Sequence, residues 1–498
     1  MKRKLYKNLS VSVISNIIIL VLSLVIPRLF LLQYGSDTNG LLTTLSQIFS
    51  YIALLEAGIS QATLVQLYKP LKNKDTEQIS EVMSISRSYY RKVTVLYATL
   101  VVALAFLVPI IIKSELNYWT IFFCVIFEGA AGVINFYFFS TQTILLNADG
   151  KGYVNELTNL AGKTGSYVVK IVLAFSGISI VLIQFGSFAI SLCKMLFYSA
   201  YMKKNYPWVN YSVKISEKKQ LPDRNAFVIS ELAWTLFSST DAIVLSVFCS
   251  TKMASVYSIN NMAFVAINSL VSAAYFGIRY ELGKAYHEGI LVYKRIHDSF
   301  NAVFMGIITA LMGVSVILLD SFISLYTNGV QDINYSYFWL PVLFGLVQML
   351  SWSRYISGNL TGIAGYAKTV SKISLLEAAI NVVLSVALVN MWGIYGVVLA
   401  TVVALPIKVI YTNYVCDKNV MNRRGISTLA KLGVDFIFFG VIVYIRWRFP
   451  IVLSNWKQFF ICGVGLSIGL SVLVIGIHVL LYPEFKRLII SKKSLLFN

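Results

Sequence analysis

Long apolar segments alternate with short polar segments along the whole chain. Residues 93–112 and 299–319 contain no charged side chain at all, and a helix needs roughly 20 apolar residues to cross a bilayer. The apolar runs are continuous and do not alternate with polar residues, which excludes a membrane β-barrel. We predict membrane-spanning helices over 8–32, 40–68, 93–113, 118–146, 155–175, 178–201, 225–249, 254–282, 298–319, 334–361, 370–390, 393–415, 430–447 and 457–482.

Composition indicates the same class of protein. The 498 residues are 57% hydrophobic and 13% charged, whereas soluble domains carry about 25% charged residues. The chain is therefore predicted to be an all-α polytopic membrane protein with about fourteen transmembrane helices. Its net charge of +20 is explained by membrane topology and anionic headgroups, and we expect no nucleic-acid partner.

Two distant segments follow one plan. Residues 142–201 and 357–415 each contain a polar turn, an apolar helix, a break of two residues and a second apolar helix that ends in a lysine, Lys194 or Lys408. The copies lie about 215 residues apart, as in membrane proteins built from two similar halves. We predict two similar halves, 1–201 (N-lobe) and 225–415 (C-lobe), joined by a cytoplasmic linker at 202–224 and followed by the last two helices and a basic tail at 416–498.

Lysine and arginine are distributed unevenly between the loops. The loops at 175–178, 320–333 and 390–393 contain neither residue. Because basic loops stay in the cytoplasm, both termini are expected there. Arg446 and Arg448 depart from this rule. The basic clusters fall within residues 2–7, 69–92, 203–224, 284–295, 418–424 and 486–493.

Charged side chains inside the spans are costly and need a reason. Near the predicted cytoplasmic ends, the expected role is snorkelling of the charged group to lipid headgroups; this applies to Lys163, Lys194, Arg354 and Lys408. Deeper, Lys170 and Glu128 are expected either to form a structural ion pair or to face a cavity. Arg28 follows Pro27, Glu56 and Asp241 lie well inside their spans, and Arg279 lies either at a cavity rim or at the interface.

Enzymatic chemistry has no support in the chain. The five cysteines and three histidines are scattered, with no metal-ligand spacing and no implied disulfide. Nucleotide-binding and nucleophile motifs are absent from the sequence. We expect no catalytic residue, no metal and no cofactor, although H⁺ or Na⁺ remains open as a coupling ion.

Several motifs resemble one family. Residues 41–67, with Glu56 at the centre of Ser50–Ile59, resemble the second-helix signature of polysaccharide repeat-unit flippases, which usually has Asp at that position. Residues 240–245 and 254–259 resemble the seventh-helix aspartate and the start of the eighth helix. These are the Wzx-type members of the MATE-like multidrug/oligosaccharidyl-lipid/polysaccharide (MOP) exporter superfamily.

The resemblance implies two pseudo-symmetric six-helix lobes with two further C-terminal helices and a cavity between the lobes. It also implies transport of undecaprenyl-pyrophosphate-linked sugar repeat units for O-antigen, capsule or exopolysaccharide across a bacterial plasma membrane. Basic groups would hold the pyrophosphate, and polar and aromatic groups the sugars. Partners would be the lipid-linked oligosaccharide, membrane lipids, and a polymerase and glycosyltransferases of the same pathway. The cavity candidates are Arg28, Glu56, Asp241, Arg279, Lys170, Glu128, Asn16, Trp234, Tyr257, Asn261 and Tyr275.

Other functions remain open at this point. A multidrug antiporter of the same fold would use Glu56, Asp241 or Glu128 as a titrating group, and a lipid II flippase is closely related to the first hypothesis. A membrane scaffold is a third class, but it gives no reason for the charges inside the spans. The excess of basic residues favours an anionic substrate over a cationic drug.

The predicted topology can be tested with reporter fusions. A reporter inserted within 202–224 or at the C-terminus should report the cytoplasm, and one inserted at 325–332 the outside, because of the lysine and arginine distribution. Termini on opposite sides of the membrane would show that the number of spans is odd.

Overall fold

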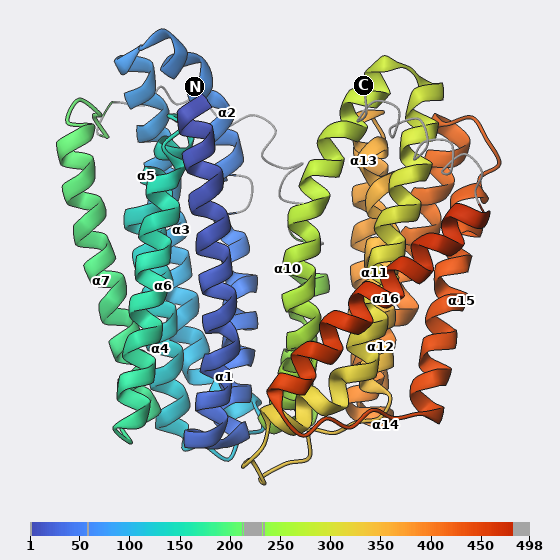
Figure 1. Ribbon diagram of the computed structural model, residues 1–498. Coiled ribbons are helices and arrows are strands. Elements are labelled where there is room, and N and C mark those ends of the chain that lie inside the picture. The colour runs from blue at the N-terminus through green and yellow to red at the C-terminus, as the bar shows by residue number, and fades with distance from the viewer. Residues whose placement is uncertain (1, 57–58, 212, 214–231, 233–234, 482–498) are drawn as a thin grey trace. The chain divides into compact units, whose positions relative to one another are not determined.

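A computed structural model describes residues 2–56, 59–211, 213, 232 and 235–481 (Figure 1). This part of the chain is 87% helical and contains no strand, which confirms the predicted all-α fold class. The first helices are α1 (Lys2–Ala53), α2 (Ile59–Asn73), α3 (Thr76–Ile111), α4 (Tyr118–Ile134), α5 (Ser140–Ala148), α6 (Gly152–Phe175) and α7 (Ile180–Asn205). They are followed by α9 (Asp241–Phe248), α10 (Thr251–Glu288), α11 (Ile290–Tyr326), α12 (Leu340–Trp352), α13 (Tyr355–Ile363), α14 (Ala367–Val415), α15 (Ser427–Arg448) and α16 (Trp456–Leu481).

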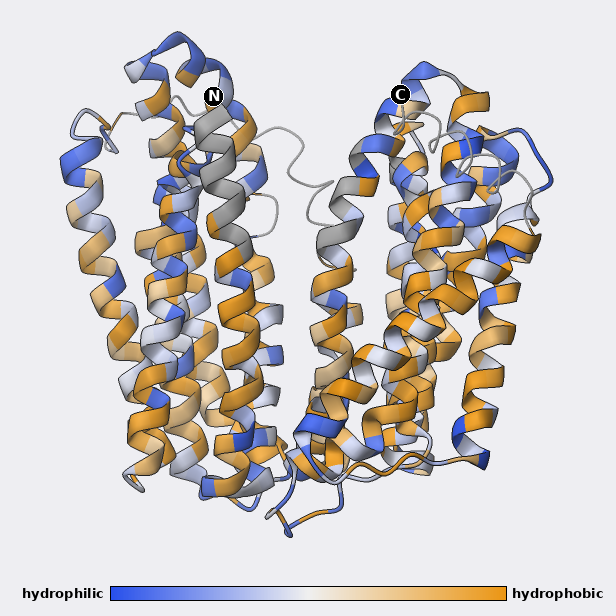
Figure 2. Cartoon of the chain, in the orientation of Figure 1, coloured by the Kyte–Doolittle hydropathy of each residue, from blue (hydrophilic) through white to orange (hydrophobic). Residues whose placement is uncertain are grey.

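Most of the apolar helices expose the greater part of their most apolar stretch. Only 6% of that stretch is buried in α16, and α11, with 83% buried, is the exception among the eight apolar helices of the described residues. Figure 2 shows apolar residues along most of the helices. Eight helices in the described part of the chain are long and apolar enough to cross a membrane. Hydrocarbon cannot hydrogen-bond a backbone, so helices that satisfy their own amides are the stable choice there. The chain is a multi-pass membrane protein.

Two of the longest helices each contain a sharp break at a glycine. Gly35 in α1 has φ 78° and Gly393 in α14 has φ 55°, a left-handed conformation that favours glycine. Each break divides one long helix into two of the predicted spans. Next to the second break, a Cβ on Gly396 would lie 2.3 Å from the backbone oxygen of Leu388, so the chain turns tightly there.

Helix ends differ from the predicted spans in a systematic way. The predicted span 93–113 is part of α3, which begins at Thr76 after Asp75 accepts a hydrogen bond from the Gln78 amide (2.9 Å). Hydropathy marks only the stretch inside the hydrocarbon, so a helix that continues into water is predicted too short. Two predicted spans are also interrupted. A π-helical turn at Asn135–Phe139 interrupts the span predicted over 118–146, and a 3₁₀ turn at Leu54–Glu56 interrupts the span predicted over 40–68.

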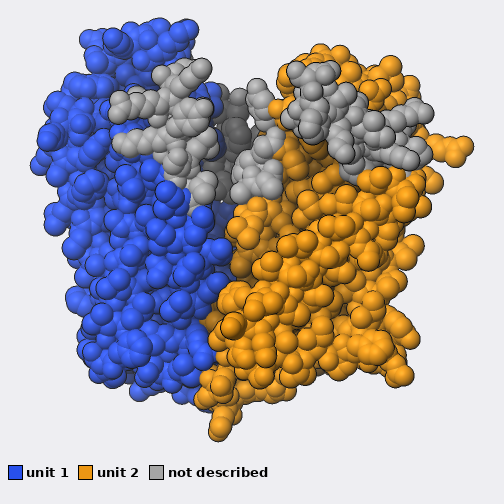
Figure 3. All heavy atoms as spheres, viewed as in Figure 1, with its two compact units in different colours: residues 1–255 blue, residues 256–498 orange. Residues whose placement is uncertain are grey.

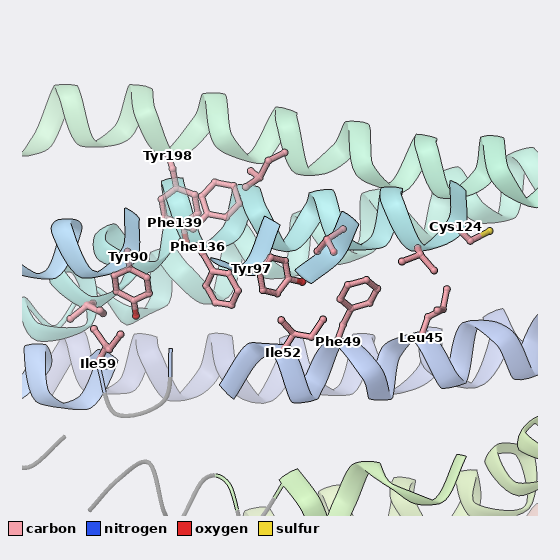
Figure 4. Close-up of a cluster of buried hydrophobic side chains, with 14 of the residues drawn as sticks. Leu45, Phe49, Ile52, Ile59, Tyr90, Tyr97, Cys124, Phe136, Phe139 and Tyr198 are labelled. Atoms are coloured by element: carbon pink, nitrogen blue, oxygen red, sulfur yellow. The ribbon is translucent and has the colours of Figure 1, made fainter. Parts of the chain in front are cut away.

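The chain forms two compact units, residues 1–255 and 256–498 (Figure 3). The described residues of the predicted seventh span and the first turn of α10 belong to the first unit. The predicted linker 202–224 lies mostly outside the described residues, and the predicted lobe boundary stays a prediction. In the core of unit 1, Phe49 of α1 packs near Tyr97 of α3, which meets Phe136 edge to face at 4.8 Å (Figure 4).

Loops of unit 1 meet in the two groups that the predicted topology requires. At the predicted outer side, the Tyr34 hydroxyl donates to the Ile178 carbonyl oxygen (2.5 Å). At the predicted cytoplasmic side, Lys151 and Tyr206 join across two loops (2.9 Å), with Asp149 beside them. Burial opposes the charge of Lys151, but its bonds to Tyr206 and Asp149 outweigh that effect and raise its pKa.

One buried carboxylate ties three segments of unit 1 together. Asp37 accepts hydrogen bonds from the Ser114 hydroxyl (2.6 Å), the Glu115 amide (3.0 Å) and the Thr251 hydroxyl. Nearby, Gly40 approaches the start of α10 so closely that a Cβ would lie 1.7 Å from the Thr251 carbonyl oxygen. The sequence did not single out Asp37, because its three partners lie far away along the chain.

In unit 2 the buried charges are paired. Arg354 is 6% exposed and its guanidinium donates to Glu377, which is 2% exposed. The snorkelling role predicted for Arg354 is therefore wrong: a buried carboxylate on α14 holds the side chain inside the unit. Arg446 donates to Asp320 (2.7 Å), and this ion pair gives a reason for a basic residue at the predicted outer side.

We expect Gly40→Ala to lower the stability of the protein by about 1–3 kcal/mol, the usual cost of overpacking. The added methyl group would overlap the Thr251 carbonyl. Thermal unfolding of detergent-purified protein measures the effect. Gly433→Ala is the control, because a Cβ at Gly433 meets nothing within 4 Å. Equal melting temperatures for the two variants would contradict the close approach.

We expect Arg354→Met to destabilise unit 2 by about 3–5 kcal/mol, because it leaves the Glu377 carboxylate buried without its partner. The double variant Arg354→Met/Glu377→Leu should recover most of the loss. The same thermal unfolding experiment applies. If the double variant is no more stable than the single one, the buried ion pair is not what holds Arg354 in place.

Candidate functional site

A polar pocket lies within unit 1 between α4, α6 and α7. Its volume is about 250 Å³, and we call it the lysine pocket. Its polar walls come mainly from Glu128, Asn159, Lys163, Lys170, Gln184 and Lys194.

Helical periodicity places these side chains on facing helix surfaces. On α6 the polar lining residues are 159, 163, 166 and 170, and on α7 they are 184, 187, 191 and 194. Spacings of three and four residues put side chains on one face of a helix. Gln184 and Asn159 were not among the residues predicted for a site. The two polar stripes at helical spacing were the signal that could have identified them.

Neutral amides hold the charged groups of the lysine pocket. The Lys194 ammonium donates to Asn159 Oδ1 (2.7 Å) and lies 4.7 Å from the centre of the Phe139 ring. The snorkelling predicted for Lys194 is therefore wrong, because its charged group is bound inside the unit. Gln184, 3% exposed, donates from Nε2 to Glu128 Oε2 (3.4 Å). Its own Oε1 has no hydrogen-bond partner within the described part of the chain.

The charge of the lysine pocket is not balanced. Lys163, Lys170 and Lys194 face a single carboxylate, Glu128, and none of the three forms an ion pair among the described residues. The structure does bring Lys170 and Glu128 into one pocket. The direct ion pair predicted as one alternative for them is not formed among the described residues, and Glu128 accepts a hydrogen bond from Gln184 instead.

An apolar groove adjoins the lysine pocket on α6 and α7. This α6–α7 groove has a volume of about 480 Å³, and its lining includes Leu157, Ala161, Gly165, Ile190, Cys193 and Phe197. Gly162, Ile190 and Lys194 line both the groove and the pocket. At Gly165 the backbone of α6 lies close to α7, since a Cβ there would touch the Ile190 side chain at 3.5 Å.

Glu56 and Asp241 lie elsewhere in unit 1. Glu56 ends the 3₁₀ turn that interrupts the predicted second span and accepts a hydrogen bond from the Ser140 hydroxyl (3.4 Å). Asp241 is the first residue of α9 and is 7% exposed. Beside it, the Ala242 amide donates to Gln47 of α1 (3.0 Å). Neither carboxylate lines the lysine pocket.

The remaining predicted residues are dispersed. In unit 1, Arg28 is half-buried in α1 and Asn16 is exposed, while Trp234 lies outside the described residues. In unit 2, Arg279 is exposed and Asn261 is half-buried.

The two predicted tyrosines of unit 2 take part in aromatic packing. Tyr257 meets Phe344 at 5.3 Å. The Tyr275 hydroxyl donates to the Tyr355 carbonyl oxygen (3.0 Å), and the Tyr275 ring lies 6.2 Å from that of Trp352. The structure therefore gives each ring a packing role within unit 2.

No protein-family model matches the chain, and no curated protein matches it in sequence. Solved structures do match. The lipid II flippase MurJ in an inward closed conformation is 13% identical, with a TM-score of 0.66 over 94% of this chain and 98% of that one. An inward-facing multidrug resistance MATE family transporter of the MOP superfamily is 12% identical, with a TM-score of 0.63 over 90% of this chain and 99% of that one.

A third match is the MATE multidrug transporter DinF-BH. It is 12% identical, with a TM-score of 0.58 over 84% of this chain and 96% of that one. At identities this low, the structural matches establish similarity of fold alone. The chain has the fold of these transporters, and the predicted resemblance is confirmed at the level of the fold.

Proposed function

We propose that this protein is a flippase of the bacterial plasma membrane that carries undecaprenyl-pyrophosphate-linked oligosaccharide repeat units from the cytoplasmic to the outer leaflet. The observation that carries the proposal is the unbalanced positive charge of the lysine pocket between α4, α6 and α7. A fold similar to that of a lipid II flippase supports it.

The charge of the substrate is the physical reason. A pyrophosphate carries several negative charges, and moving such a group through hydrocarbon without compensation costs many kcal/mol. Ammonium groups inside the membrane offset that cost through charge-assisted hydrogen bonds. A cationic drug would be repelled by the same lysines. The partners that this function implies are the glycosyltransferases that make the lipid-linked repeat unit and the polymerase that consumes it.

A cation-coupled multidrug antiporter is the second candidate, and the half-buried Glu128 and the buried Asp241 favour it. Two of the similar structures are multidrug transporters. Coupling to H⁺ or Na⁺ requires a carboxylate whose charge changes or is compensated during the cycle. Lipid II, another lipid-linked saccharide, is a third possible substrate, and a transport assay separates it from the repeat unit.

The test is transport by purified protein in liposomes. We expect it to move a fluorescent undecaprenyl-pyrophosphate oligosaccharide between leaflets, and to give no proton flux on addition of a cationic drug. Glu56→Gln and Asp241→Asn should keep part of the activity, because a neutral amide retains hydrogen bonding. Lipid II in place of the oligosaccharide tests the closely related substrate.

The antiporter hypothesis predicts a different result in the same assay. Drug-dependent proton flux that Glu56→Gln or Asp241→Asn abolishes, without movement of the glycolipid, would replace the flippase by the antiporter. Empty liposomes and liposomes with heat-denatured protein control for leakage and for spontaneous lipid exchange.

A further inference from the structure

The lysine pocket and the α6–α7 groove form one continuous feature with two chemical characters. The pocket is polar and positively charged, the groove is apolar, and Gly162, Ile190 and Lys194 belong to both. A ligand that fits the whole feature has an anionic group joined directly to a hydrocarbon chain. That combination is the chemistry of a lipid phosphate or diphosphate.

Size restricts which part of such a ligand enters the pocket. Pockets that enclose drug-sized molecules measure about 300–1,000 Å³, and the lysine pocket measures about 250 Å³. An oligosaccharide is too large for it, whereas a diphosphate group is not. The groove, at about 480 Å³, has room for the part of the chain next to the phosphates.

The pocket lysines lie well inside their helices. Lys163 and Lys194 lie near the midpoints of α6 and α7, about 16 Å from the nearer helix end at 1.5 Å per residue. A phosphate bound by these two ammonium groups would therefore lie beside the middle of both helices.

The buried side chain of Gln184 gives a second reason to expect a ligand in the lysine pocket. Gln184 is 3% exposed, lines the lysine pocket, and its Oε1 lacks a hydrogen-bond partner in the described part of the chain. An unsatisfied buried acceptor costs about 1–3 kcal/mol. A hydrated or singly protonated phosphate group in the pocket offers the donor that this oxygen lacks.

We propose that the lysine pocket binds the diphosphate of a polyisoprenyl diphosphate during its passage across the membrane, while the α6–α7 groove holds the adjoining isoprene units. The proposal rests on the proposed function for the identity of the lipid. Lys163, Lys170 and Lys194 supply the positive charge. Glu128 and Asn159 position the neighbouring amide and ammonium groups and leave two or more lysines available to the ligand.

A native cysteine in the groove provides the readout. Cys193 is exposed and lines the α6–α7 groove, whereas Cys124 and Cys416 are buried. In full-length protein carrying Cys249→Ala and Cys462→Ala, a membrane-permeant maleimide should therefore label Cys193. The rate of labelling is measured in nanodiscs with undecaprenyl diphosphate, undecaprenol, phosphatidylglycerol or inorganic pyrophosphate added.

We expect undecaprenyl diphosphate to slow the labelling of Cys193 at concentrations at which the other three compounds do not. Lys170→Gln and Lys194→Gln should each weaken this protection roughly 10-fold, the effect of losing one charge-assisted hydrogen bond. Lys372→Gln changes an exposed lysine of unit 2 and should leave protection unchanged. Ala161→Leu should fill the groove and remove protection, whereas Val172→Leu, on the exposed face of α6 outside the groove, should not.

Several outcomes would overturn the proposal. Equal protection by undecaprenol would show an apolar groove without a diphosphate site, and equal protection by phosphatidylglycerol an ordinary lipid site. Protection by inorganic pyrophosphate alone would show a site for free anions. The comparison of the four compounds on the protein with all its lysines needs no further substitution, so a variant that fails to fold does not remove the test.

The liposome assay keeps this proposal separate from the proposed function. Transport of the lipid-linked oligosaccharide without protection of Cys193 would remove the site and leave the function intact. Protection of Cys193 without transport of the oligosaccharide would keep the site and overturn the function.

Discussion

A charge inside a membrane-spanning segment must find a partner, and the packing of this protein depends on that constraint. Placing one charged residue at the centre of a membrane helix costs about 2.5–3.5 kcal/mol on insertion scales. In unit 2 the cost is offset by direct pairs: Arg354 with Glu377, and Arg446 with Asp320. The first pair joins the start of α13 to the next helix, α14, and the second joins α15 to the distant α11, so the pairs also fix which helix faces which.

In unit 1, several charged groups inside the fold have hydrogen-bonding partners in place of an opposite charge. Its buried carboxylate Asp37 is satisfied entirely by hydrogen-bond donors at one end of the unit. Amides, an aromatic ring and the Glu128 carboxylate lie around its three pocket lysines, and none of these lysines forms an ion pair among the described residues. Positive charge held in this way is kept within the membrane without being neutralised, and a protein that only needed stability would gain from a paired or apolar alternative.

Much of the fold follows from the sequence because the bilayer leaves few choices. Continuous apolar runs predicted the helices, and the two-residue breaks in the repeat predicted the turn at Gly393. Helix ends were missed at Thr76 and Ile290, where helices continue beyond the hydrocarbon. The lysine pocket was missed as a site because the rotation of each helix about its axis depends on distant contacts. The roles of Arg354 and Lys194 were predicted wrongly for the same reason. Their partners, Glu377 and Asn159, lie on neighbouring helices, and no local sequence pattern indicates these contacts.

The side chains that contact the charges of the lysine pocket, Asn159 and Gln184, are neutral amides. A carboxylate in place of Asn159 would form a buried ion pair with Lys194, and an arriving phosphate would have to displace it. An amide oriented toward the ammonium fixes its position through a bond of 2.7 Å but leaves its charge available. Transport also requires release, because a site that binds too tightly holds its ligand instead of passing it on. Glu128, whose negative charge shares the pocket with Lys170, limits the attraction for an anion. A net positive pocket with one internal carboxylate and neutral amide supports therefore fits a site that a charged group occupies only in passing.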